Sequence, residues 1–189
     1  MNVPEKLLKA CIKEDRRAQS ELYRHCFGVM MGICMRYLKD EQEAVAALNQ
    51  SFLKVLKGLE KRNPKAPFEA WLRRLTINTV IDEYRRNKKF HAHIQVEDFS
   101  EGSGYTHSLD FNEADRRLDA EEIERLIQAL PPVTQQVFNL YAIDGYSHRE
   151  IAKMLEISEG TSKWHVSTAR SRLKEQMAHM INYSEKTKL

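Results

Sequence analysis

One stretch of the sequence decides the fold of the last third of the chain: Gly145-Tyr146-Ser147-His148-Arg149-Glu150-Ile151-Ala152-Lys153-Met154-Leu155, followed by Glu156-Ile157-Ser158-Glu159-Gly160-Thr161. Ser147 and Glu150 form a capping box, in which the hydroxyl accepts from an amide of the first turn and the carboxylate reaches back. The apolar spacing over residues 151–155 gives that helix one buried face. Only a turn fits before Ser158, a second cap residue that opens another helix, reaching about Arg172 or beyond. The stretch therefore predicts a helix-turn-helix, whose second helix enters the major groove of DNA.

The second helix can be oriented from its spacing, at ~100° per residue. One stripe is expected to pack inward: Ser162, Val166, Ala169 and Leu173. The residues that then project outward are Lys163, Trp164, Ser167, Thr168 and Ser171. Trp164 could cover a thymine methyl, and Lys163 could donate to guanine or phosphate. The alternative is that the helix rolls slightly and Trp164 covers the hydrophobic core. Three further cations are placed to hold phosphates: Arg149, Arg170 and Arg172.

Length and composition exclude several classes of protein. The 189 residues allow one large or two small domains, and no stretch approaches the ~20 apolar residues of a membrane span. Charged residues between positions 9 and 15 interrupt any secretion signal, so a cytoplasmic protein is expected. Cys11, Cys26 and Cys34 form no CxxC pair and suit a reducing compartment. With His25 they fit no standard zinc spacing, so we expect core cysteines, no metal and no cofactor.

Charge is distributed unevenly along the chain, although the net charge is only +3. Residues 73–89 contain six cations and two carboxylates, whereas residues 97–124 contain ten carboxylates and two arginines. A basic segment, an acidic connector and a basic helix-turn-helix indicate two separate DNA contacts, joined by a segment that DNA repels.

Periodicity predicts an all-α chain of two small helical domains. Helices are expected over 2–37 (two of them), 43–59 and 68–88, with a loop at 61–67 that contains Pro64 and Pro67. Helices resume near Asp115, break at Pro131-Pro132, and continue over 133–142 into the helix-turn-helix. The expected organisation is a first domain over 1–90, a flexible linker over 91–118, a second domain over 119–181 and a tail over 182–189.

Both halves resemble one family. Phe68-Glu69-Ala70-Trp71-Leu72, with Asn78, Asp82, Arg85 and Arg86 on the same helix, looks like the promoter-melting helix of a bacterial sigma factor. Leu130-Pro131-Pro132-Val133, Val137-Phe138, Tyr141, Gly145-Tyr146-Ser147 and Glu150-Ile151-Ala152 resemble its −35-reading domain. The two-domain arrangement is similar to the small extracytoplasmic-function (ECF) class of the sigma-70 family.

The resemblance implies that the first domain docks on core RNA polymerase and opens the −10 region. The loop over 62–67 lies where such proteins capture a flipped base, which suits Asn63 and Lys65, although an ordinary helix connector fits as well. Trp71 could stack on a base at the point of strand separation, or it could be core. The residues implied to contact −10 or melted DNA are Arg62, Asn63, Lys65, Trp71, Arg73, Arg74, Asn78, Arg85 and Arg86.

The third helix departs from the family pattern. Val45 and Ala46 stand where the family carries an acidic pair for the polymerase clamp, and Asn49-Gln50 replaces Gln-Glu. Ile77 likewise stands where the family often has a basic residue. The implied polymerase contacts are Asp40, Glu41, Glu43, Asn49 and Gln50. Either these residues dock with more apolar surface, or the affinity for core polymerase is lower.

The competing function is a stand-alone helix-turn-helix regulator with a sensing or dimerising first domain, which predicts a palindromic operator and no dependence on polymerase. An enzyme is not expected, because Asp82 and Glu83 lie on different helical faces and no nucleophile or metal spacing occurs. The partners that the resemblance implies are core RNA polymerase and promoter DNA, duplex and melted. The sequence leaves open whether an anti-sigma factor also binds; the linker would let both domains close around one.

Overall fold

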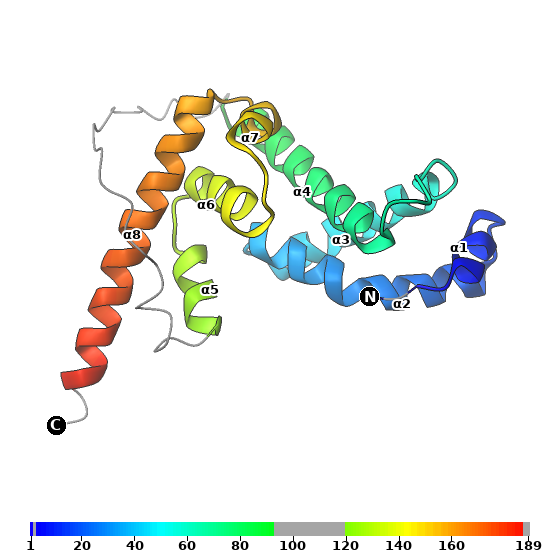
Figure 1. Cartoon of the computed structure of the whole chain (residues 1–189), viewed down its shortest axis with the longest axis horizontal. Helices are drawn as coiled ribbons and strands as arrows, with labels where there is room; N and C mark the ends of the chain where they lie inside the picture. Colours follow the sequence, from blue (N-terminus) through cyan, green and yellow to red (C-terminus); the bar gives the residue numbers. More distant parts are fainter. Residues whose placement is uncertain (2, 93–119, 187–189) are drawn as a thin grey trace. The chain divides into compact units, whose positions relative to one another are not determined.

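The computed structural model describes residues 1, 3–92 and 120–186, and every regular element in these ranges is helical (Figure 1). The all-α prediction is confirmed for this part of the chain. The chain divides into two compact units, Met1–Gln95 and Val96–Leu189. The first two positions of the predicted linker, 91 and 92, are helical, and the rest of the linker lies outside the described residues. The helix start expected near Asp115 also lies outside them.

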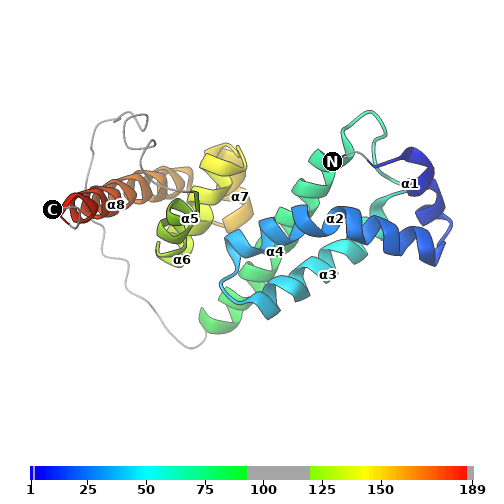
Figure 2. The same cartoon turned by 90° about the horizontal axis from the view of Figure 1, so that it is seen from below.

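Four helices form the described part of the first unit: α1 (Glu5–Ile12), α2 (Arg16–Tyr37), α3 (Glu41–Gly58) and α4 (Phe68–Ala92). Helices α2, α3 and α4 pack against one another, and α1 packs on α2 (Figures 1 and 2). The largest fully buried side chains of this core are Leu22, Met30, Ile33, Leu48, Val55, Leu72, Val80 and Ile81. Burial of each such side chain stabilises the fold by about 1.5–3 kcal/mol, so this core fixes which faces of α3 and α4 reach solvent.

Two aspartates set the helix starts in the first unit. The Asp15 carboxylate accepts from the amides of Arg17 and Ala18, at 2.8 and 3.0 Å. Asp40 accepts from the amide of Glu43 at 2.9 Å. These bonds satisfy amides that have no partner within the helix. Because Asp40 is the cap, α3 begins two residues before the start expected from apolar spacing.

The three cysteines lie in the core of the first unit, as their apolar positions predicted. Burial raises the pKa of the Cys26 thiol to about 12 and that of Cys34 to about 11, and it also raises the pKa of Cys11. These thiols therefore stay protonated and unreactive near neutral pH. Within the described parts of the chain, no three His, Cys, Asp or Glu side chains come together as a metal site.

The second unit is built from α5 (Ala120–Gln128), α6 (Pro132–Phe138), the π-helix η1 (Asn139–Ile143), α7 (His148–Leu155) and α8 (Glu159–Lys186). Its core joins Leu130 and Phe138 to Ala169 and Leu173, with Leu126 and Ile127 packed against them. Pro132 lies in the first turn of α6, where its missing amide costs nothing. Helix α8 continues to Lys186, so positions 182–186 of the expected tail are helical. None of the helices described is both long and apolar enough to cross a membrane.

The helix expected over 133–142 forms, but its second half is a π-helix rather than an α-helix. After Phe138 the chain widens into the π-helix, and the Asp144 amide donates to the Asn139 carbonyl at 3.0 Å. Gly145, at φ +75°, then turns the chain, and the Tyr146 amide donates to the Leu140 carbonyl at 2.9 Å. Asn139 and Leu140 are buried in the π-helix. The apolar spacing of so short a segment does not distinguish a π-helix from an α-helix.

Candidate nucleic-acid interface

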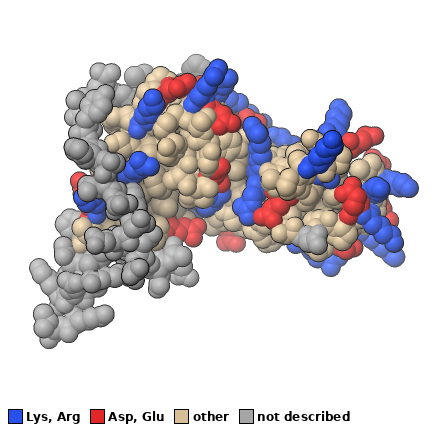
Figure 3. Space-filling model, viewed as in Figure 1, with Lys and Arg blue, Asp and Glu red and all other residues tan. Residues whose placement is uncertain are grey.

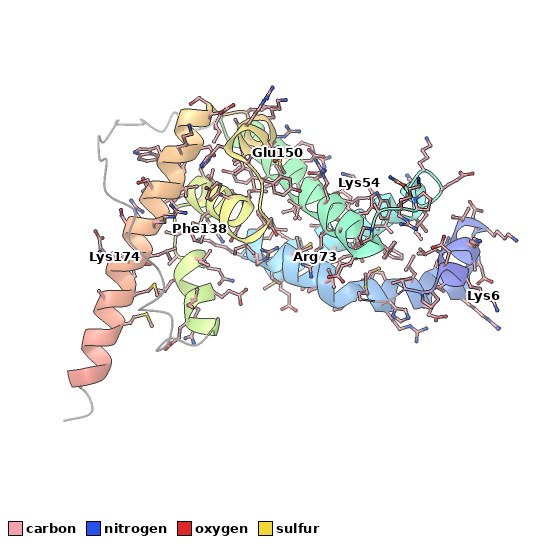
Figure 4. All side chains as sticks on the ribbon, viewed as in Figure 1. Lys6, Lys54, Arg73, Phe138, Glu150 and Lys174 are labelled. Atoms are coloured by element: carbon pink, nitrogen blue, oxygen red, sulfur yellow. The ribbon has the colours of Figure 1, made fainter. Side chains whose placement is uncertain are left out.

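The helix-turn-helix begins with the predicted capping box. The Ser147 amide donates to Glu150 Oε2 at 3.0 Å, and the Glu150 amide donates to Ser147 Oγ at 3.3 Å. Glu150 thus lies in the first turn of α7 (Figure 4). Both ends of the box are satisfied locally, so the start of α7 is fixed by sequence alone.

The turn between α7 and α8 depends on one residue in the left-handed region. Glu156, at φ 57°, ends α7, and the Ile157 amide donates back to the Ala152 carbonyl at 3.1 Å. The second cap also forms as predicted, because the Thr161 amide donates to Ser158 Oγ at 2.9 Å. The turn is therefore confined to residues 156–158, and α8 packs against α7.

The inward stripe of α8 is confirmed, since Ser162, Val166, Ala169 and Leu173 are all buried. His165 is buried as well, and its Nδ1 lies 3.0 Å from the hydroxyl of Thr134 on α6. His165 was not among the residues predicted to face inward. Its burial could have been predicted only from its position four residues before Ala169, at the edge of the inward stripe. On that side the stripe packs against α6.

The outward face of α8 combines a tryptophan with polar side chains. Trp164 keeps 41% of its surface exposed, and its ring meets His165 edge-on with centroids 4.8 Å apart. Lys163 is exposed, and Ser167 and Thr168 are half-buried. Trp164 therefore lies on the surface rather than covering the core; its contact with DNA stays a prediction.

Further cations surround this face. Arg149 on α7 is exposed, as are Arg170 and Arg172 on α8. Lys174, labelled in Figure 4, is exposed as well. The Arg170 guanidinium lies over the ring of Tyr141, 5.9 Å from its centroid. Exposed cations flanking a polar helix face are suited to phosphates on either side of a groove.

In the first unit, the loop between α3 and α4 presents two exposed polar side chains, Asn63 and Lys65. Asn63 Oδ1 accepts from the Lys65 amide at 3.0 Å, so the asparagine also shapes the turn. Both residues are accessible to a nucleobase, as base capture requires.

Arg62 is placed differently from its neighbours, and here the interpretation as a DNA contact is corrected. Its side chain is only 7% exposed and pairs with Glu5 of α1 at 3.5 Å. It also donates to the Ala66 carbonyl at 2.9 Å and lies over the Phe68 ring. The guanidinium thus holds the loop together, because its donors are spent within the unit.

Trp71 packs inside the first unit. A Cβ added to Gly58 would lie 3.0 Å from its indole ring, and the Phe68 ring centroid lies 5.8 Å away. The residue is half-buried, so part of its surface still reaches solvent. Of the two alternatives, packing is what the structure contains, while stacking on a base stays a prediction.

The cations of α4 are mostly paired within the helix. Arg73 lies 2.8 Å from Glu69 (Figure 4), and the other pairs are Arg85 with Asp82 at 2.9 Å and Arg86 with Glu83 at 3.5 Å. Arg74 and Asn78 are exposed on the same helix. On the face drawn in Figure 3, Lys and Arg side chains of this unit project between Asp and Glu. Ile77, the departure from the family pattern, is buried.

The expected polymerase contacts lie at the start and along one side of α3. Glu41 and Glu43 are exposed, Gln50 is half-buried, and Asn49 Oδ1 accepts from the Tyr23 hydroxyl at 2.9 Å. Between Glu43 and Lys57, the exposed residues of α3 form a neutral stripe.

That stripe contains Ala46, Asn49 and Leu53, and Leu53 is 58% exposed. Val45, in the other position of the missing acidic pair, is half-buried. Apolar surface thus takes the place of part of the acidic pair.

Comparison with known proteins matches each unit to one part of the same family. The family model described as sigma-70 region 2 matches residues 22–90, and the one described as sigma-70, region 4 matches residues 120–173. The RNA polymerase sigma-H factor of Pseudomonas aeruginosa is 25% identical over 186 residues, covering 94% of this chain and 95% of that protein. The ECF RNA polymerase sigma factor SigM of Mycobacterium tuberculosis is 27% identical over 180 residues, covering 94% and 84%.

Two solved structures are similar to this chain. The sigma factor RpoE, in complex with the anti-sigma factor NepR from Bartonella quintana, has a TM-score of 0.48 and 17% identity, covering 82% of this chain and 94% of that one. CnrH, in complex with the cytosolic domain of CnrY, has a TM-score of 0.47 and 18% identity, covering 92% and 96%.

The two family models lie in the order region 2, then region 4, and together they match more than half of the chain. Relatives named as ECF sigma factors align with nearly all of it. The chain belongs to the sigma-70 family of RNA polymerase sigma factors and, within it, to the ECF group.

Proposed function

We propose that the first unit of this sigma factor docks on core RNA polymerase and opens the −10 element, and that the second unit reads the −35 element. The observation that carries the proposal is the outward face of α8, where Lys163 and Trp164 are exposed. This helix is the second of a helix-turn-helix whose first helix begins with a complete capping box. A buried indole would be expected if this helix only packed. The region 2 match supports a second, separate DNA contact in the same chain.

In the second unit, reading and holding are divided between faces. Base edges are read by Lys163, Trp164, Ser167 and Thr168 from the outward face of α8. Phosphates are held by Arg149, Arg170 and Arg172, whose loss weakens binding to every sequence alike. The exposure of all seven side chains, full or partial, supports this division.

In the first unit, Asn63 and Lys65 line the place where a flipped base is captured. Arg73, Arg74, Asn78, Arg85 and Arg86 hold the strands along α4. Trp71 contributes through the edge that packing leaves accessible. Arg62 acts indirectly, because it braces the loop against α1.

Docking on core polymerase uses Asp40, Glu41, Glu43, Asn49 and Gln50, next to the neutral stripe of α3. Reversing the two exposed charges together, Glu41→Lys with Glu43→Lys, is expected to weaken core binding about tenfold. A matched control is Glu60→Lys, which changes an exposed glutamate beyond the end of α3. If a pull-down titration gives the double variant and the control equal affinity, the interface lies elsewhere.

The role is that of a cytoplasmic initiation factor and not of an enzyme, since the polymerase performs the chemistry. The test is transcription from a library of genomic fragments by core polymerase, with and without the purified chain. We expect transcripts to start at a subset of fragments that share two elements at constant spacing. If start sites do not depend on the chain, and the chain alone protects a palindrome, it is a stand-alone regulator.

A further inference from the structure

An aromatic stack joins the π-helix to the helix-turn-helix. The rings of Tyr141 and His148 lie nearly parallel, 15° apart, with centroids at 4.4 Å. The edge of the His148 ring contacts α8, because its Nδ1 lies 3.0 Å from the hydroxyl of the buried Ser162. Tyr141 is thereby tied to both helices of the helix-turn-helix.

Arg170 lies on this stack. Its guanidinium is over the Tyr141 ring at 5.9 Å, and among the residues that the structure describes no carboxylate pairs with it. Arg170 follows Lys163 by seven positions, so both project from the same side of α8. The positive charges of Lys163 and Arg170 add to burial in lowering the pKa of His148, so both lie near it.

A long exposed arginine normally samples many rotamers, and ordering it on binding costs free energy. A planar guanidinium over an aromatic face loses part of that freedom before any ligand arrives. Tyr141 lies within the π-helix, and its ring contacts both His148 of α7 and Arg170 of α8.

We infer that Tyr141 is a positioning residue for DNA binding: supported by His148, its ring orients Arg170 toward one phosphate of the promoter backbone. The inference rests on the proposed function and adds a residue that does not itself touch DNA. It also assigns a role to the π-helix, which sequence periodicity did not predict.

The experiment uses the full chain bound to core polymerase and a duplex recovered by selection over randomised −35 elements. Binding is measured as a function of KCl, and ethylation interference maps the phosphates. For Arg170→Ala we expect the slope of log K against log salt to fall by about 0.9, with loss of one interfering phosphate. For Tyr141→Leu we expect DNA affinity to fall by about two- to fivefold. Interference at the phosphate that Arg170→Ala loses should weaken as well. Tyr141→Phe keeps the ring and is expected to behave as wild type.

A double-mutant cycle separates positioning from a general structural role. In an Arg170→Ala background, Tyr141→Leu should cause little further loss of DNA affinity. In the control background, Arg172→Ala, it should cause its full loss of about two- to fivefold. Equal addition in both backgrounds would overturn the inference.

Arg170→Lys covers the case in which Tyr141→Leu does not fold, since it keeps the charge and removes the planar group. Wild-type affinity in Arg170→Lys would overturn the inference, and a two- to fivefold loss, about that of the stack, would support it. If the wild-type holoenzyme does not bind the duplex, the proposed function fails, and the inference with it. Binding without any dependence on Tyr141 removes the inference alone.

Discussion

Helices α4 and α8 are the two proposed DNA-facing helices, and each carries one of the two tryptophans of the chain. Trp71 on α4 lies against Gly58 and the ring of Phe68, whereas Trp164 on α8 is 41% exposed. The same residue type is therefore mainly structural in one unit and available to a ligand in the other.

The cations of the two helices differ in the same way. On α4, Arg73, Arg85 and Arg86 each pair with a carboxylate one turn away. On α8, no ion pair involves Lys163, Arg170 or Arg172 among the described residues. Under the proposed function, DNA competes with carboxylates for the cations of α4, whereas the three cations of α8 have no ion-pair partner among the described residues. Sequence-independent affinity should therefore come mainly from the second unit.

The largest expected effects separate the two tryptophans. Trp71→Ala leaves a cavity beside Gly58 and should destabilise the first unit by about 2–4 kcal/mol. Trp164→Ala removes an exposed ring and should change the stability of the second unit by less than about 1 kcal/mol. Thermal unfolding followed by circular dichroism measures both.

Selection over randomised −35 elements provides the complementary readout for Trp164→Ala. We expect a loss of about 1–3 kcal/mol at one promoter position, with altered preference there. An unchanged preferred element combined with a melted second unit would mean that Trp164 is a core residue, and the contrast between the helices would be lost.

The next effect concerns charge. Arg172→Ala should lower the salt slope of holoenzyme binding by about 0.9, because a phosphate contact and its counterion release are lost. Arg86→Ala should lower it less, since Glu83 already neutralises part of that charge. Conversely, Asp82→Asn removes a carboxylate that pairs with Arg85 and with Lys54, and it should make the slope steeper. A larger decrease for Arg86→Ala than for Arg172→Ala would contradict the comparison.

What the sequence predicted well is local. The caps at Ser147 and Ser158 act within three residues, so the helix-turn-helix and the inward stripe of α8 followed from spacing alone. The overall all-α organisation followed for the same reason.

What it missed depends on residues distant in the chain. Arg62 reads as one more cation in a basic loop, and only the fold brings Glu5 to it. His165 is buried opposite Thr134, and Trp71, for which the sequence left both alternatives open, lies against Gly58 of α3. Charge and periodicity say which residue types are available, and tertiary contacts decide which of them remain free for a ligand.

A smaller effect is expected from pH, in the second unit. Burial lowers the pKa of His148, and the nearby positive charges of Lys163 and Arg170 lower it further, against an opposing effect of Glu159. The folded state thus favours the neutral imidazole of His148. This contribution to the free energy of unfolding is fully present above the unfolded-state pKa of histidine, about 6.5, and it decreases as the pH drops below that value. Melting of the second unit between pH 8 and pH 5 measures this. His148→Gln should flatten that dependence; an equally steep one would assign it to other groups.

The smallest effect tests whether the two units store backbone strain alike. Each has one glutamate in the left-handed region, Glu14 after α1 at φ 60° and Glu156 after α7 at φ 57°. That conformation costs roughly 1–2 kcal/mol for a residue with a Cβ. Glycine relieves the cost but gives back about 0.4–1 kcal/mol through unfolded-state entropy. Each Glu→Gly variant should therefore gain about 0.5 kcal/mol over the matching Glu→Ala variant, which loses the side chain but keeps the strain. Urea unfolding measures the difference. A gain at Glu14 without one at Glu156 would mean that the turn of the helix-turn-helix does not store backbone strain at Glu156.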